Sequence, residues 1–174
     1  MKTLTGKKIV MIIAAHDFRD EELLVPRAYF QNLGAQVTIA SSTTATVTGM
    51  LGAAIRPDIL YTTINPVFYD AVIFVGGGGA EQYWDDPAAH RIARDTLFAH
   101  KVLAAICIAP VTLAKAGVLQ GKKATVWMDE QSLLKANGAD YTGQEVTVDG
   151  SIVTADGPAH ALPFSRSIAD LLLP

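Results

Sequence analysis

Residues 101–117 read KVLAAICIAPVTLAKAG, and the rest of the chain can be interpreted around this stretch. Its apolar run, 102–106, has the length and composition of a strand that is buried on both faces. Small and aliphatic residues follow that can continue as a helix, and Pro110 suits a first helical turn. Cys107, the only cysteine of the chain, joins the two segments. We therefore predict a strand that turns abruptly into a helix at Cys107.

A cysteine at this junction has two interpretations. At the start of a helix, free backbone N–H groups and the helix dipole favour an anion. We therefore predict that the pKa of the Cys107 thiol is lower than that of a free cysteine. The alternative is a small buried core residue, which is a common role of free cysteines. This stretch by itself leaves both interpretations open.

Length and composition limit the class of protein. A chain of 174 residues is expected to form one domain, 1–174. The net charge of −3 and the lack of a Lys/Arg block argue against nucleic acid or an anionic membrane as a partner. A single cysteine excludes an internal disulfide and a cysteine-based zinc site, and we predict no metal and no cofactor.

Hydropathy raises the question of a membrane segment. The longest apolar region, 97–119, contains three charged or titratable residues and a proline, so it does not fit a spanning helix. The first residues, MKTLTGKK, lack the pattern of a cleavable signal. The expected location is therefore the cytoplasm.

Strand and helix signals alternate along the remaining chain. Pro26 should kink or divide the first helix, and Asp149–Gly150 suits a tight hairpin turn. The order predicts an α/β fold, a parallel sheet with helices on both faces and a β-hairpin excursion. The predicted elements are strands at 8–15, 35–41, 70–75 and 121–127, helices at 16–34, 87–99, 129–137 and 162–173, and hairpins at 43–65 and 142–154.

Active sites of parallel α/β sheets gather at the carboxyl ends of the strands. Three features are predicted to meet there, namely Glu21–Glu22, the glycine run 76–79 and Cys107. The glycine run lacks the Lys-Ser/Thr pair of a nucleoside-triphosphate loop and the glycine spacing of a dinucleotide site. It is therefore either a tight turn or a source of backbone N–H groups that stabilise an oxyanion beside Cys107.

Several motifs together carry a resemblance that covers nearly the whole chain. The chain resembles the ThiJ/PfpI superfamily, whose fold is flavodoxin-like. This superfamily is related to class I glutamine amidotransferases and includes PfpI-type intracellular proteases and the parkinsonism-associated protein deglycase. The motifs are the F-x-D-x-E-L-x-x-P pattern (Phe18, Asp20, Glu22, Leu23, Pro26), the turn Gly76–Gly77, the elbow AAICIAP, and GKKATVW, VDGSIVTADGP and LPFSRSI, which favour the PfpI branch.

The resemblance implies roles for particular residues. Cys107 would be the nucleophile and Glu22 a carboxylic acid hydrogen-bonded to it, with the N–H groups of Gly77 and Ile108 as the oxyanion site. A desolvated glutamate beside a thiolate should keep its proton, because two adjacent anions are costly. Glu81 matches an acid that PfpI-type proteases contribute across a subunit interface. A homodimer or a larger homo-oligomer is therefore expected.

The chain also departs from both branches. PfpI-type proteases have a histidine where this chain has Ile108, and the deglycase branch has one near the place of Trp127. Isoleucine can neither deprotonate a thiol nor protonate a leaving amine. His160 and His16 are the remaining candidates near the sheet edge, and each could instead be a loop histidine without a chemical role.

Because the expected histidines are missing, the reaction that depends least on a separate general base is favoured. We expect a stress-response enzyme of the glyoxalase or deglycase type, acting on a small-molecule carbonyl substrate (an α-oxoaldehyde) or on a glycated protein, with Glu22 moving the proton. The alternative is a redox-responsive or chaperone-like protein in which Cys107 is oxidised to a sulfinate. Amide hydrolysis by a PfpI-type peptidase is a weaker alternative, because of Ile108.

Overall fold

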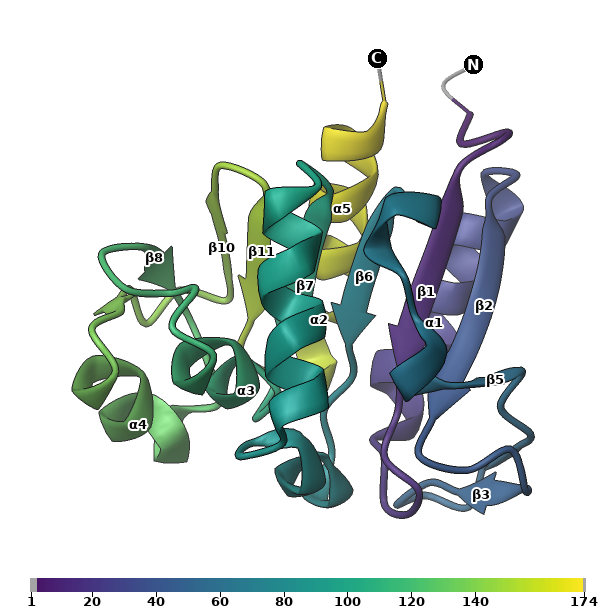
Figure 1. The fold of residues 1–174 in the computed structure, drawn as a ribbon, viewed down its shortest axis with the longest axis horizontal. Coiled ribbons are helices and arrows are strands. Elements are labelled where there is room, and N and C mark those ends of the chain that lie inside the picture. The colour runs from purple at the N-terminus through teal and green to yellow at the C-terminus, as the bar shows by residue number, and fades with distance from the viewer. Residues whose placement is uncertain (1–2, 174) are drawn as a thin grey trace.

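The computed structural model describes residues 3–173 and has a seven-stranded central sheet (Figure 1). Its strand order is β10-β11-β7-β6-β1-β2-β5. Neighbouring strands are parallel except for β10 and β11, which form an antiparallel hairpin at one edge. The strands are β1 (Lys8–Ile12), β2 (Gln36–Ser41), β5 (Ile59–Leu60), β6 (Ala71–Phe74), β7 (Val102–Ile106), β10 (Val146–Asp149) and β11 (Ile152–Ala155).

Helices cover both faces of this sheet. In Figure 1, α2 (Pro87–Phe98) crosses the front, whereas α1 (Asp20–Asn32) and α5 (Ala161–Leu172) lie behind. Two shorter helices, α3 (Pro110–Lys115) and α4 (Gln131–Ala136), extend the front layer past β7. The predicted flavodoxin-like α/β fold is confirmed, with the qualification that the sheet is mixed because β10 is antiparallel.

Two apolar cores lie on the two faces of the sheet. Successive residues of β1 alternate between them, so that Ile9 and Met11 face one core and Val10 and Ile12 the other. All four side chains are fully buried. A strand covered by helices on both faces must be apolar at every position, and this explains the unbroken apolar runs in the sequence.

Most predicted elements are present, with two differences. The excursion at 43–65 contains the expected hairpin, β3 (Val47–Thr48) and β4 (Ala54–Ile55), but β5 then joins the main sheet beside β2. Within the predicted strand 121–127, only β8 (Lys123–Ala124) is a strand. It pairs with β9 (Asp140–Tyr141) in a separate two-stranded sheet. Strands of two residues show no periodicity, so the sequence pattern could not place them.

The predicted hairpin of β10 and β11 is present, but its turn lies one residue later than predicted. Asp149 pairs with Ile152, so the turn residues are Gly150 and Ser151, and Gly150 has a φ of 59°. Of the two effects predicted for Pro26, a kink or a division of the first helix, the division is wrong, because α1 is continuous from Asp20 to Asn32. Short 3-10 segments connect other elements, at Tyr61–Thr63, Pro66–Phe68, Gly78–Tyr83, Met128–Glu130 and Pro158–His160. Within residues 3–173, no helix combines the length and hydropathy that crossing a bilayer requires.

Candidate active site

Cys107 occupies a sharp turn directly after β7. Its φ of 64° lies in the left-handed region, which costs a residue with a Cβ about 1–2 kcal/mol. Two backbone hydrogen bonds fix this conformation. The Cys107 N–H donates to the Ala155 carbonyl at 2.9 Å, and the Cys107 carbonyl accepts from the Trp127 N–H at 2.8 Å. The predicted abrupt turn between strand and helix is therefore present.

Glu22 approaches Cys107 from α1, and Gly76 lies between them. The Glu22 side chain is fully buried, and its Oε2 accepts from the Gly76 N–H at 2.9 Å. Its Oε1 has no hydrogen-bond partner among the described residues. A Cβ added at Gly76 would lie 2.6 Å from the Cys107 Cβ and would overlap Glu22 Oε2. The close approach of the acid and the thiol therefore requires glycine at position 76.

Burial dominates the electrostatics of this pair. It raises the pKa of Glu22 to about 8, although contacts with Cys107 and the Gly76 N–H act in the opposite direction. Glu22 therefore keeps its proton at neutral pH, as the sequence led us to expect.

Burial also raises the pKa of Cys107, and the neighbouring Glu22 raises it further. The backbone N–H groups of Gly77 and Ile108 act to lower it without reversing the shift. The prediction of a lowered thiol pKa is wrong. The helix that follows, α3, has only six residues and starts at Pro110, so its dipole is weak compared with the loss of water around the sulfur.

The glycine run forms a tight turn that packs against the segment after β1. The Gly76 carbonyl accepts from the Arg19 N–H at 2.9 Å, and the Gly79 N–H donates to the Asp17 carbonyl at 3.1 Å. Gly77 has a φ of 101°, and a Cβ there would overlap the backbone of residues 17–19. These contacts hold the Gly77 N–H beside the sulfur, which is the arrangement that an oxyanion site requires.

Asp20 fixes a third loop at the site. Its buried carboxylate accepts from the Leu51 N–H at 3.0 Å and from the Ala53 N–H at 2.8 Å. These bonds hold the loop between β3 and β4, and with it Met50, whose Sδ accepts from the Gly78 N–H at 3.4 Å. The sequence singled out Asp20 only as part of a motif and gave no signal for Met50.

A pocket of about 370 Å³ opens onto Cys107, and we call it the Cys107 pocket. The predicted residues Gly77, Glu81, Ile108 and Trp127 meet there, whereas Glu22 lies beneath its surface. Four residues of the wall, Arg19, Met50, Glu130 and Pro158, were not predicted as part of the site. The complete lining is Arg19, Met50, Gly77, Gly78, Glu81, Cys107, Ile108, Trp127, Glu130 and Pro158.

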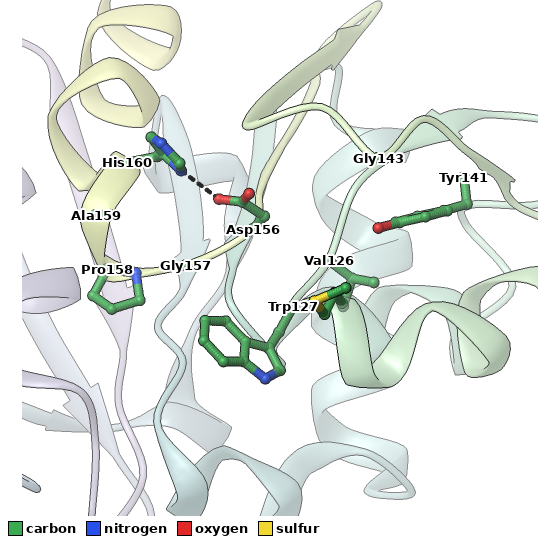
Figure 2. A pocket seen from close by; sticks show the side chains of 10 residues that line it. Val126, Trp127, Tyr141, Gly143, Asp156, Gly157, Pro158, Ala159 and His160 are labelled. Atoms are coloured by element: carbon green, nitrogen blue, oxygen red, sulfur yellow. Dashed lines mark hydrogen bonds and ion pairs between the residues drawn. The ribbon is translucent and has the colours of Figure 1, made fainter.

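None of the four histidines lines the Cys107 pocket. His16 is exposed, with its Nδ1 3.3 Å from Asp17 Oδ2. His160 lines a neighbouring cavity of about 470 Å³, shown in Figure 2, and its Nδ1 lies 2.6 Å from Asp156 Oδ1. The structure thus places both candidate histidines away from the lining of the Cys107 pocket. Among residues 3–173, no group of three or more His, Cys, Asp or Glu side chains could hold a metal ion.

The chain is similar to known proteins over almost its whole length. The deglycase PH1704 of Pyrococcus horikoshii is 32% identical over 163 residues, covering 94% of this chain and 98% of that protein. The glutathione-independent glyoxalase DJR-1.2 of Caenorhabditis elegans is 24% identical, with 95% and 89% covered. The crystal structure of a ThiJ/PfpI domain protein from Brachyspira murdochii superimposes with a TM-score of 0.93 at 30% identity, covering 99% of this chain and 98% of that one.

The family model described as the DJ-1/PfpI family matches residues 7–171. This range includes the buried glutamate, the glycine turn and the cysteine elbow. The chain therefore belongs to the DJ-1/PfpI family, within the ThiJ/PfpI superfamily.

Proposed function

We propose that this protein is a cysteine-dependent enzyme that acts on α-oxoaldehydes or on their adducts with amines. One observation carries the proposal, namely a fully buried Glu22 whose pKa of about 8 keeps it protonated beside Cys107. A carboxylic acid with a pKa near the working pH can both donate and accept a proton during turnover. The relatives named deglycase and glyoxalase support the same class of reaction.

The first step is addition of the thiol to the aldehyde carbon. The Cys107 sulfur forms a bond to carbon, and the electron pair of the C=O π bond moves onto oxygen. Glu22 donates its proton to that oxygen and receives the thiol proton, so that a neutral hemithioacetal results. The N–H groups of Gly77 and Ile108 are close to the sulfur and can stabilise the developing oxyanion.

The second step converts this adduct into the product. Glu22 donates its proton to the ketone oxygen and, as carboxylate, removes the proton from the former aldehyde carbon, which gives an enediol. It then returns that proton to the neighbouring carbon and takes up the proton of the hydroxyl on the former aldehyde carbon, which leaves a protonated Glu22 and a thioester of a 2-hydroxy acid. Water then cleaves the C–S bond, which releases the hydroxy acid and restores the thiol. The sequence is an internal redox reaction, so it needs no external oxidant or reductant.

The absence of histidine from the pocket lining disfavours the protease alternative. Expulsion of an amine from a peptide requires a group that first removes the thiol proton as a base and then donates it to the leaving amine as an acid, a role that a histidine beside the cysteine would fill. In this chain Ile108 occupies that position, and the histidines at 16 and 160 lie elsewhere. An aldehyde is more electrophilic than an amide and loses no leaving group in the first step.

Turnover of methylglyoxal tests the proposal. The wild-type protein should produce lactate, Cys107→Ala should be inactive, and Glu22→Gln should lose activity by orders of magnitude while it keeps its fold. Glu21→Gln is the matched control, because Glu21 is adjacent but pairs with Arg19 at 2.9 Å on the surface of α1. Near wild-type turnover by Glu22→Gln would refute the assigned role of the acid.

One observation favours a second candidate function. Glu22 Oε1 is buried without a partner among the described residues, so a protonated Glu22 has a free hydrogen-bonding oxygen near Cys107. A sulfinate formed on Cys107 by peroxide would supply an acceptor. Intact mass spectrometry after graded peroxide exposure tests this role. A redox-responsive protein should gain two oxygen atoms at Cys107 and turn over no aldehyde, and Glu22→Gln should progress further, to the sulfonate.

A further inference from the structure

The two N–H groups of the oxyanion site come from separate segments of the chain. Gly77 belongs to the turn after β6, whereas Ile108 follows Cys107 at the elbow after β7. β6 and β7 pair along the sheet, and the last residues in register are Phe74 and Ala105. Both N–H groups lie beyond this pair, so the strand ladder does not fix the distance between them.

One side chain connects the two segments. Trp84 directly follows the 3-10 segment Gly78–Tyr83, which continues from the glycine turn. Its indole Nε1–H donates to the Ile108 carbonyl at 3.2 Å. Apart from the contacts of the sulfur itself, no other hydrogen bond among the described residues joins the segment 76–84 to the elbow, 107–110. The indole is therefore the direct link between the two sources of N–H groups.

The position of Trp84 is itself fixed by its neighbours. Its backbone N–H donates to the Glu81 carbonyl at 3.1 Å, and its carbonyl lies 2.7 Å from His90 Nε2. Because a carbonyl can only accept, His90 donates from Nε2, and this bond ties Trp84 to α2. The side chain is partly buried and packs against the core that α2 covers. A residue held in this way can keep the glycine turn and the elbow in a fixed relation.

The Ile108 carbonyl does not need the indole in order to be hydrogen-bonded. It already accepts from the Val111 N–H at 3.2 Å, in the turn that begins α3. The indole is thus a second donor to the same oxygen. It restricts the orientation of Ile108, the residue whose own N–H faces the sulfur. Trp84 does not line the Cys107 pocket, so it acts on the site through Ile108 and not through contact with a substrate.

We propose that Trp84 is a positioning residue of the oxyanion site, whose indole N–H sets the spacing between the N–H groups of Gly77 and Ile108. The proposal rests on the proposed function, because it concerns the oxyanion that forms when Cys107 adds to an aldehyde. Deletion of one oxyanion donor costs an enzyme about 10²–10³ in kcat. Loss of the Trp84 N–H displaces a donor without deleting it, so the expected decrease in kcat is smaller, about tenfold.

Trp84→Phe tests the proposal, because it removes the indole N–H and keeps an aromatic ring against the same core. With methylglyoxal, kcat should fall about tenfold, and KM should stay nearly unchanged because Trp84 does not line the pocket. Alkylation of Cys107 by iodoacetamide in the folded protein is a readout independent of turnover. The N–H groups of Gly77 and Ile108 act to lower the pKa of the thiol, so the curve of alkylation rate against pH should shift to higher pH.

Lys115→Met is the matched control. Lys115 Nζ lies 5.8 Å from the centroid of the Trp84 ring and pairs with the exposed Asp85 at 2.8 Å. The substitution removes a contact with the face of the ring and leaves the indole N–H in place, so kcat and the alkylation curve should match those of the wild type. Where the smaller ring of Trp84→Phe destabilises the fold, 3-benzothienylalanine incorporated at position 84 repeats the test, because it replaces only the N–H with sulfur.

The results separate positioning from simple stabilisation. A lower melting temperature of Trp84→Phe, with kcat and the alkylation curve unchanged, would overturn the proposal, because the indole would then only stabilise the fold. Equal changes in Lys115→Met would also overturn it, since the ring and not its N–H would be responsible. If the wild-type protein turns over no aldehyde, an alkylation curve that shifts in Trp84→Phe alone would support the role of Trp84 and refute the proposed chemistry.

Discussion

Glu22→Gln should stabilise the fold by an amount that increases with pH. The pKa of Glu22 rises from 4.5 to about 8 on burial, so the folded state favours the protonated form. Below pH 4.5 Glu22 is protonated in both states and does not destabilise the fold. As the pH rises from 4.5 toward 8, the free energy of unfolding falls by about 1.4 kcal/mol per pH unit, because the acid ionises only in the unfolded state. Between pH 5 and pH 7 the loss is about 3 kcal/mol. Glutamine does not titrate, and its oxygen can still accept from the Gly76 N–H.

Urea unfolding at pH 5, 6 and 7 measures this difference. The free energy of unfolding of Glu22→Gln, minus that of the wild type, should increase steadily across the series. Glu21→Gln is the control, because the hydrogen bond with Arg19 lowers the pKa of Glu21, and this acid is ionised in both states over this range. A difference between Glu22→Gln and the wild type that stays constant from pH 5 to pH 7 would show that Glu22 is ionised in the folded protein.

Three further predictions concern the thiol, the Met50 loop and assembly. Iodoacetamide should alkylate Cys107 at neutral pH at least tenfold more slowly than free cysteine, because burial raises the pKa of the thiol. In Glu22→Gln, the curve of alkylation rate against pH should shift to lower pH. Mass spectrometry measures both rates. Asp20→Asn should lower the free energy of unfolding in urea by about 1–2 kcal/mol. It should also raise KM more than it lowers kcat, because the loop that carries Met50 is no longer held in place. An unchanged KM would contradict this. Light scattering should show at least a homodimer, and a monodisperse monomer would refute this. Glu81→Gln should keep its turnover in the intact oligomer, and a collapse of turnover would show that Glu81 has a catalytic role.

The sequence predicted the parts of the fold that depend on local patterns. The apolar run before Cys107 and the helix signal after it reflect contacts between near neighbours, and both are confirmed. The hairpin signal at Asp149–Gly150 is confirmed as a hairpin, with its turn displaced by one residue to Gly150–Ser151. The pairing of β5 with β2 could not be predicted, because it is a contact between distant segments with only two residues in register.

The site shows the same division. The motif containing Glu22 and the elbow predicted that Glu22 and Cys107 lie together, and the structure has them on either side of Gly76. The direction of the Cys107 pKa shift depends on how much water the surrounding loops exclude, which is a property of packing and has no pattern in the sequence. Met50 enters the pocket for a similar reason, since its position depends on the anchoring of its loop by Asp20.

The left-handed backbone at Cys107 has a consequence for how the chain evolves. At a φ of 64°, glycine is the residue that suits the backbone best, and Cys107→Gly should be more stable than Cys107→Ala by about 1 kcal/mol. Selection for folding alone would therefore favour glycine at this position. Cysteine there carries a cost in stability that the fold itself does not require.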